Sequence, residues 1–333
     1  MGKVFKQDVL LTPSIYTLFL YILLNDRWAE SDYVLHKRIP LVVQDNLEAT
    51  GARVYTDYLQ GQNNTILTKL MQNVLYWKYL RYSRNVTYAN VYGNDEFYLS
   101  MKYRNQGIKI IEDGPYYNDK ELLRARRTKQ YAGLLNYWFY WLWRDYVPLG
   151  FDKHVSTVYH TEFNHLPAEI QDKGVLIDMR QLWQRKSEVD QQKIAQVFGL
   201  NKDVVDKLEK CKTILVTQEF PNSVSDSEKI LMYKNLLQDN GIEQSGLLIK
   251  SHYAEKTNYR QAFPEATVID TPVPAQLLDM IGYEADTALT ISSSAIFAFV
   301  KPNTKIVFKG TEFDERLLRF YGVIKLEDFV KKA

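Results

Sequence analysis

Two adjacent acids stand at the end of a short apolar stretch, at residues 108–114 (IKIIEDG). A buried strand here delivers Glu112 and Asp113 to the carboxyl edge of a sheet, where open α/β sheets hold their ligands. Gly114 allows a sharp turn and leaves space beside the acids. A carboxylate in this position can take a proton from a substrate hydroxyl. The plainer interpretation is a strand followed by an ordinary acidic turn.

Two other predicted strand ends carry groups that bind an anion. His252 follows a predicted strand that ends at Lys250, and it can donate a proton or a hydrogen bond to a phosphate oxygen. Hydroxyl groups and free amides at a helix start also bind anions, here in a serine run before the predicted helix 295–300: Ser292, Ser293 and Ser294. Each group alone is more typical of a capping loop or a structural histidine. Together they favour a nucleotide phosphate site, although neither G-x-x-x-x-G-K-[ST] nor G-x-G-x-x-G is present.

Alternating strands and helices are predicted to carry these groups. The segment at 8–14 is typical of a strand that stops at a Thr-Pro turn, and Ser14 is a natural N-cap for the apolar helix 15–24. The other strands predicted in the first half are 33–35, 41–43, 86–91, 96–99 and 108–111, with a helix at 65–80. The strands predicted in the second half are 213–217, 246–250, 267–269, 288–291 and 305–308. Helices are expected between them, at 226–237 and from Pro274 onward. This alternation predicts an α/β protein.

A length of 333 residues suggests two domains. We expect an N-terminal α/β domain at 1–150, a helical connector at 151–210 and a second α/β domain at 211–310. The connector has helical patterns at 181–198 and 202–208. Terminal helices within 311–333 are expected to cross back to the first domain.

Composition excludes several classes of function. Hydrophobic residues make up 46% and charged residues 25%, which is typical of a soluble globular protein, and a net charge of +2 is too small to indicate nucleic acid as a general partner. The single cysteine, Cys211, excludes an intramolecular disulfide and fits a reducing, cytoplasmic compartment. No signal peptide is visible, and the apolar run at 15–24 is too short to span a bilayer. The three histidines of the connector lack the close spacing of metal ligands: His154, His160 and His165.

One segment combines cationic and aromatic residues. Residues 120–129 hold five lysines and arginines, and 134–143 reads LLNYWFYWLW. This pattern suits peripheral attachment to a membrane interface, such as the inner face of a bacterial membrane. The alternatives are a helix packed into the protein and a subunit contact, which would make the protein a homodimer.

The order of the motifs resembles that of the bacterial sialyltransferases of glycosyltransferase family 52, with a more distant likeness to bacterial polysialyltransferases. The similarity rests on the acid-acid-glycine motif at 112–114, the Lys-Ser-His-Tyr motif at 250–253 and the serines at 292–294. The opening VLLTPS and the run that ends in Val-Pro-Ala-Gln at 273–276 match as well. The resemblance covers most of the chain.

The resemblance implies a GT-B architecture, with two Rossmann-like domains facing a central cleft. It implies transfer of sialic acid from CMP-sialic acid to a terminal galactose of a lipooligosaccharide or capsule-type glycan, with inversion and without a metal or other cofactor. No D-x-D sequence is present to hold a cation on a nucleotide diphosphate. The nucleotide-binding residues that the resemblance implies are Lys250, His252, Pro274, Gln276, Ser292, Ser293 and Ser294.

The base that activates the acceptor is one of three acids: Asp113, Glu112 or Asp226. Adjacent residues at a strand end point to opposite sides, so only one acid of the pair can face a substrate. Asp113 lies next to the glycine and has the freer approach, which favours it over Glu112. The third acid, Asp226, lies before a predicted helix of the second domain.

Two positions depart from the family pattern. Tyr253 stands where the family has a proline after the histidine, and Gln276 stands where it has an acid. These departures motivate two alternatives. One is a glycosyltransferase that uses another sugar nucleotide, such as a UDP-hexose, and the other is a non-catalytic sugar-nucleotide-binding protein.

Overall fold

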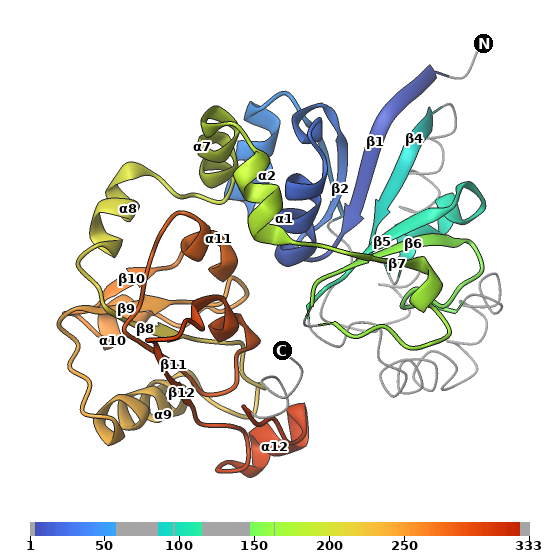
Figure 1. Cartoon of the computed structure of the whole chain (residues 1–333). Coiled ribbons are helices and arrows are strands. Elements are labelled where there is room, and N and C mark those ends of the chain that lie inside the picture. The colour runs from blue at the N-terminus through green and yellow to red at the C-terminus, as the bar shows by residue number, and fades with distance from the viewer. Residues whose placement is uncertain (1–3, 58–85, 96, 115–146, 163, 327–333) are drawn as a thin grey trace. The chain divides into compact units, whose positions relative to one another are not determined.

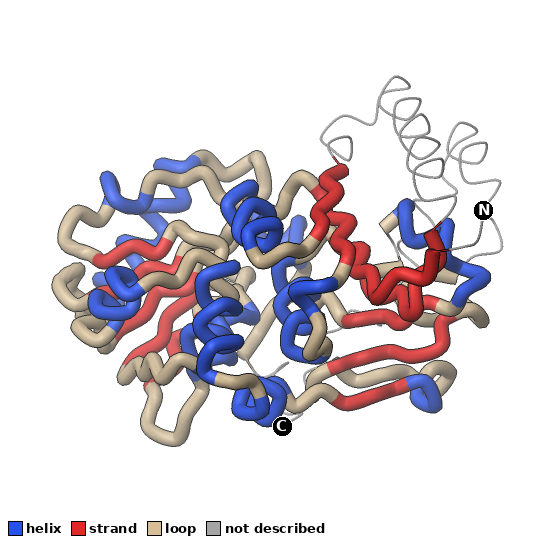
Figure 2. The backbone as a smooth tube through the Cα atoms, turned by 90° about the horizontal axis from the view of Figure 1, so that it is seen from above, coloured by secondary structure: helices blue, strands red, loops and turns tan. Residues whose placement is uncertain are grey.

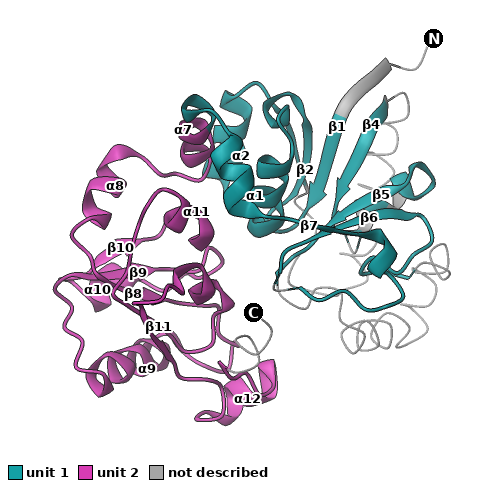
Figure 3. Ribbon diagram, viewed as in Figure 1, with its two compact units in different colours: residues 1–190 teal, residues 191–333 magenta. Residues whose placement is uncertain are grey.

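A computed structural model describes residues 4–57, 86–95, 97–114, 147–162 and 164–326 of the chain. The chain divides into two compact units, residues 1–190 and 191–333 (Figure 3). Each unit has its own parallel sheet with helices packed on it (Figure 1).

The first unit is a doubly wound α/β fold. Its described strands pair in parallel in the order β3-β2-β1-β4-β5-β6-β7. The order reverses between β1 and β4, and ligands of open α/β sheets bind at such a switch point, beyond the carboxyl ends of the strands. The strands are β1 (Val4–Thr12), β2 (Asp32–His36), β3 (Arg53–Asp57), β4 (Val86–Gly93), β5 (Ile108–Ile111), β6 (Val155–His160) and β7 (Gly174–Leu176). The helices are α1 (Ile15–Leu24), α2 (Leu41–Ala49) and α6 (Met179–Arg185), with 3-10 turns η1 (Trp28–Glu30), η2 (Tyr98–Gln106) and η4 (Gln171–Lys173).

The start of the chain folds as its sequence predicts. Strand β1 ends at Thr12, and the Oγ atom of Ser14 accepts the main-chain N–H groups of Tyr16 and Thr17 at 3.1 and 3.3 Å. This cap satisfies two amides that the first turn of α1 leaves without a partner. Eight of the ten side chains of α1 are buried, so the helix is fixed by packing as well as by its cap.

The second unit is a smaller fold of the same type. Its described strands pair in parallel in the order β10-β9-β8-β11-β12, and the order reverses between β8 and β11. Figure 2 shows helices on both sides of this sheet. The strands are β8 (Thr213–Val216), β9 (Leu247–Lys250), β10 (Thr267–Ile269), β11 (Thr287–Thr290) and β12 (Lys305–Phe308). The helices are α7 (Glu188–Val197), which begins in the first unit, α8 (Lys202–Leu208), α9 (Asp226–Asp239), α10 (Tyr259–Ala262), α11 (Ala275–Met280), α12 (Glu315–Tyr321) and the 3-10 helix η5 (Ser294–Phe299).

All five strands predicted for the second unit are confirmed, but some predicted elements are wrong. The strand expected at 41–43 is the first turn of α2, because Pro40 occupies the N-cap position and starts a helix. The strand expected at 96–99 is replaced by η2, which begins at Tyr98. The helix expected at 181–198 is two helices, because α6 ends at Arg185 and α7 begins at Glu188.

The expected domain boundaries also change. Strands β6 and β7 lie within the expected connector at 151–210, yet they pair with β5 in the first sheet, so this segment is not a separate connector. In the expected terminal segment 311–333, Leu317 of α12 is buried in the core of the second unit, so its described part packs there. The helix predicted at 65–80 and the cationic and aromatic segments at 120–143 lie outside the described residues. None of the described helices is long and apolar enough to cross a bilayer.

Glycine is required where β4 reaches its carboxyl end. Gly93 pairs with Leu11 of β1 and has a φ of 141°, and a Cβ atom there would lie 1.9 Å from the main-chain oxygen of Leu11. We predict that Gly93→Ala lowers the free energy of unfolding by about 2–4 kcal/mol, measured by urea denaturation, because it adds a clash to backbone strain.

Gly51→Ala is the matched control for this prediction. Gly51 also has a positive φ, 97°, but no heavy atom lies within 4 Å of an added Cβ. The control removes the clash and keeps the strain, so it should cost only about 1–2 kcal/mol. Equal losses in the two variants would contradict the importance of the contact with Leu11.

Candidate active site

The two acids that follow β5 have opposite environments. The side chain of Glu112 is fully buried and Asp113 is exposed. Glu112 Oε1 accepts the hydroxyls of Tyr16 at 3.0 Å and Thr161 at 2.6 Å, and its Oε2 accepts the Thr161 N–H at 2.9 Å. Burial raises the pKa of Glu112, and these hydrogen bonds oppose the rise only in part. Glu112 therefore binds its own protein, and Asp113 is the acid that solvent reaches.

Neighbouring polar groups connect three strand ends to the start of α1. The hydroxyl of Thr17 donates to the main-chain oxygen of Glu112 at 2.9 Å. The amide of Asn94 donates to Thr17 Oγ1 at 3.2 Å and to the main-chain oxygen of Ile111 at 3.1 Å, and it accepts from Thr12 Oγ1 at 2.5 Å. These contacts join the ends of β1, β4 and β5 beside the switch point of the first sheet. The sequence analysis did not identify Thr161 or Asn94, which stand at strand ends without a motif.

The candidate nucleotide-binding groups share one edge of the second sheet. Val216 pairs with Lys250 on one side and with Thr290 on the other, so β8, β9 and β11 end side by side. His252 and the serine run follow these ends, beside the switch point between β8 and β11. The fold thus brings together groups that are separated by about forty residues of sequence.

The serine run is held close to the sheet. The Ser293 N–H donates to Thr290 Oγ1 at 3.0 Å, and the Thr290 hydroxyl donates to the main-chain oxygen of Val216 at 2.8 Å. Ser292 is 6% exposed, and its Oγ has no hydrogen-bond partner among the described residues. Because buried hydroxyls are normally hydrogen-bonded, the unpartnered hydroxyl of Ser292 is an exception that needs an explanation. Ser294 begins the six-residue 3-10 helix η5, so the α-helix expected at 295–300 and its dipole are absent there.

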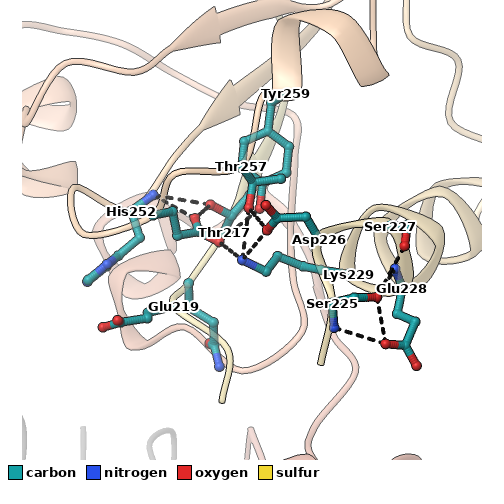
Figure 4. Close-up of polar contacts among 12 residues, drawn as sticks. Thr217, Glu219, Ser225, Asp226, Ser227, Glu228, Lys229, His252, Thr257 and Tyr259 are labelled. Carbon is teal, nitrogen blue, oxygen red and sulfur yellow. Dashed lines mark hydrogen bonds and ion pairs between the residues drawn. The ribbon is translucent and has the colours of Figure 1, made fainter. Parts of the chain in front are cut away.

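His252 is held in its uncharged form. Its main-chain N–H donates to Thr217 Oγ1 and Glu255 Oε2, both at 3.1 Å, and its ring Nδ1 accepts the Ala254 N–H at 3.3 Å. Burial, together with the positive charges of Lys250 and Lys229, lowers the pKa of His252 to about 4. An imidazole that accepts at Nδ1 carries its proton at Nε2. Figure 4 shows the ring pointing away from the polar contacts around Thr217.

The other residues of the histidine motif surround the ring. Tyr253, at the position of the expected proline, lies against His252 with ring centroids 4.6 Å apart and planes at 33°. Lys250 is buried, and its Nζ donates to the main-chain oxygen of Ser251 at 2.6 Å. Burial lowers the pKa of Lys250 to about 8. Its ammonium group therefore binds the protein backbone.

Pro274 and Gln276 lie at the start of α11, which follows β10. Pro274 is buried in the N-cap position, and Gln276 is half-buried in the first turn. Both residues thus follow the strand next to β9, and the structure records no hydrogen bond between Gln276 and the histidine or serine motifs.

A polar network that the sequence analysis missed supports the histidine loop. Glu255, with a side chain 1% exposed, accepts Lys229 Nζ at 3.1 Å and the Tyr259 hydroxyl at 2.9 Å, and it also accepts the hydroxyl of Thr217. Asp226 joins this network through the hydroxyl of Thr257 at 2.5 Å and through Lys229 at 3.5 Å (Figure 4). The signal in the sequence was the H-x-x-E spacing from His252 to Glu255.

Two of the three histidines in the expected connector have structural partners. His154 Nδ1 lies 2.7 Å from Asp152 Oδ1, and His160 Nδ1 lies 2.9 Å from the main-chain oxygen of Asn164. His165 is exposed. In the described ranges, no three His, Cys, Asp or Glu side chains are grouped as metal ligands.

The chain is similar to known glycosyltransferases. A family model described as glycosyltransferase family 52 matches residues 19–313. An uncharacterised protein of Haemophilus influenzae is 28% identical over 242 residues, which cover 71% of this chain and 73% of that protein.

Among solved structures, an α/β-galactoside α-2,3-sialyltransferase from Photobacterium phosphoreum is 12% identical with a TM-score of 0.58, covering 99% of this chain and 97% of that one. A Photobacterium 2,6-sialyltransferase in complex with CMP and lactose is 11% identical with a TM-score of 0.58, covering 91% and 71%. The GT-B domain of a sialyltransferase from Photobacterium damselae is 15% identical with a TM-score of 0.53, covering 92% and 90%. These similarities confirm the GT-B fold class.

The environment of His252 leads to a prediction for its titration. We predict that the imidazole stays uncharged from pH 7 down to about pH 4, with the proton at Nε2, as measured by ¹⁵N NMR of histidine-labelled protein. An unfolded chain binds this proton near pH 6.5. The contribution of His252 to stability is therefore complete above about pH 6.5 and is lost as the pH falls toward 4.

Lys250→Met tests the cause of this shift. Removal of one positive charge should raise the pKa of His252, while burial, the larger cause, should still hold it below 6.5. An imidazole that titrates near pH 6.5 in the unmodified protein would contradict the geometry of the loop.

Proposed function

The chain belongs to glycosyltransferase family 52, and from this premise we propose that it transfers sialic acid from CMP-sialic acid to a terminal galactose of a bacterial surface glycan, with inversion and without a metal ion. That glycan is of the lipooligosaccharide or capsule type. The observation that carries the proposal is the carboxyl edge of the second sheet. There an uncharged histidine follows β9 and a buried serine hydroxyl without a partner follows β11, the strands on either side of β8.

The hydrogen-bond donors of the protein at this edge suit a nucleotide monophosphate as the leaving group. The Nε2–H of His252 and the hydroxyl of Ser292 are neutral donors, and the two nearby ammonium groups, of Lys250 and Lys229, are engaged by protein oxygens. Neutral donors aimed at one phosphate stabilise the charge that grows on it as CMP leaves. A nucleotide diphosphate carries more charge and is commonly bound through a divalent cation.

The acceptor side of the reaction is assigned to Asp113. Its exposed carboxylate takes the proton of the acceptor hydroxyl as the hydroxyl oxygen forms a bond to the anomeric carbon of sialic acid. The bond from that carbon to the CMP phosphate breaks, and its electron pair stays on the phosphate oxygen. A single displacement of this kind inverts the anomeric centre. The buried Glu112 holds the loop that presents Asp113.

A similar solved structure supports the proposed substrates. The Photobacterium 2,6-sialyltransferase holds CMP and lactose, and lactose ends in galactose, which supports the same kinds of donor and acceptor here. The cationic and aromatic segments at 120–143 are the reason to include attachment to the inner face of the membrane, or a homodimer, for a cytoplasmic enzyme.

The proposal predicts a reaction that needs no added metal. We expect the protein to release CMP from CMP-sialic acid and to sialylate lactose at the same rate with and without EDTA, as measured by chromatography of both products. Activity that disappears in EDTA and returns with magnesium or manganese would contradict metal independence. Turnover of a UDP-hexose in place of CMP-sialic acid would favour the other donor class, and binding of CMP without transfer would favour a non-catalytic protein.

The proposed base predicts different effects for the two adjacent acids. Asp113→Asn should lower the transfer rate by about 10²–10⁴-fold, because it removes the base. Its melting temperature and affinity for CMP should stay close to those of the unmodified protein, because Asp113 is exposed. Glu112→Gln should instead lower the free energy of unfolding by about 1–3 kcal/mol, because an amide N–H₂ group replaces an oxygen that faces buried donors.

Asp226→Asn is the third variant in this comparison. Rate assays and thermal melts of all three variants separate the roles. If Asp113→Asn retains normal transfer and Asp226→Asn is inactive, the base belongs to the second unit and the assignment of Asp113 is wrong.

A further inference from the structure

We propose that Glu255 is a positioning residue that fixes the orientation and the tautomer of His252 by closing the turn from His252 to Glu255. The inference rests on the proposed function in one respect, namely that His252 donates a hydrogen bond to the phosphate of CMP. The geometry of the turn is independent of that role.

The turn is closed by three hydrogen bonds, two of which are exchanged between His252 and Glu255. The main-chain N–H of His252 donates to Glu255 Oε2 at 3.1 Å, and the N–H of Glu255 donates back to the main-chain oxygen of His252 at 3.0 Å. The N–H of Ala254 donates to the ring Nδ1 of His252 at 3.3 Å. The bond from the His252 N–H to the glutamate side chain three residues later is also found in a capping box. The turn differs from a capping box because the His252 ring accepts from Ala254 and the Glu255 N–H bonds the His252 main chain.

This turn decides which ring nitrogen of His252 carries the proton. Nδ1 must accept from Ala254 as long as the turn is closed, so Nε2 remains the donor. The turn also fixes the direction of the ring, which lies against Tyr253. A tautomer set in advance removes a rearrangement that would otherwise accompany loss of CMP.

Glu255 is itself fixed from three other segments. Its Oε1 accepts from Lys229 of α9 at 3.1 Å and from Tyr259 of α10 at 2.9 Å, while the hydroxyl of Thr217 donates to Oε2. Thr217 Oγ1 also accepts the His252 N–H, so it links the exit of β8 to the exit of β9. Four donors therefore surround one buried carboxylate, and a carboxylate, which only accepts, is the side chain that satisfies all four.

The first variant is Glu255→Gln. Its side chain keeps one acceptor oxygen, but its N–H₂ group faces protein N–H and O–H groups that also donate. We expect the ¹⁵N resonances of the His252 ring to change from a single Nε2-protonated form to a mixture of both tautomers. We expect kcat/KM for CMP-sialic acid to fall roughly 10–100-fold, since a small misplacement of a reacting group has effects of this size. Glu228→Gln is the matched control, because Glu228 closes the capping box of α9 with Ser225 and makes no recorded contact with His252.

A second variant tests the mechanism of the loss. In the double variant Lys229→Met/Glu255→Gln, the amide N–H₂ no longer faces an ammonium group and can donate to the Tyr259 oxygen. Its carbonyl oxygen can then accept the His252 N–H. We expect this double variant to restore the Nε2 tautomer and at least part of kcat/KM. If Glu255→Gln does not fold, Thr217→Val, which removes the other acceptor of the His252 N–H, provides the same readouts.

The NMR readout needs neither CMP nor turnover, so it separates the two proposals. A tautomer mixture in Glu255→Gln, together with an unmodified protein that transfers no sialic acid, would support the positioning role and overturn the proposed function. A folded Glu255→Gln protein with an unchanged His252 spectrum and unchanged kcat/KM would overturn the positioning role. A loss of melting temperature with no change in tautomer would show that Glu255 only stabilises the fold.

Discussion

The carboxylate of Glu112 is fully buried, and a buried charge is tolerated only where hydrogen-bond donors surround it. Those donors come from the start of α1 and from the end of β6, through Tyr16 and Thr161. The requirement to satisfy one carboxylate therefore fixes three elements at the edge where β5 ends. The loop that presents Asp113 inherits this fixed position, because the two acids are neighbours in the chain.

The second unit uses the same arrangement with different residues. The Glu255 side chain is buried among donors from α9, α10 and the loop after β8, and the group that it supports, His252, lies three residues earlier in the chain. In both units a buried glutamate accepts hydrogen bonds from the protein, and the proposed function assigns a nearby side chain to the substrate. An acid that served both purposes would lose its hydrogen bonds whenever it moved a proton, and the loop would lose its support at that moment.

Asp113 and His252 differ in charge and in exposure to solvent. Asp113 is exposed, as its proposed role as the base requires. His252 is uncharged because burial and two ammonium groups oppose its protonation, so it offers a directed N–H and no positive charge. A donor of this kind is most effective when its orientation is set before the reaction, since no reorganisation then accompanies the growth of charge on the leaving phosphate.

Local signals in the sequence determined much of the fold and where the site groups stand along the chain. The strand, turn and helix around Ser14, and the strands that end before Glu112 and His252, are set by apolar runs and caps within a few residues. Which acid of the adjacent pair is buried was decided only by tertiary structure, because the donors to Glu112 lie 96 and 49 residues away along the chain. The role of Glu255 and the place of β6 in the first sheet were likewise decided by packing between distant segments. A sequence window records the propensity of its own residues, whereas burial and the partners of a buried charge depend on segments that meet only when the chain folds.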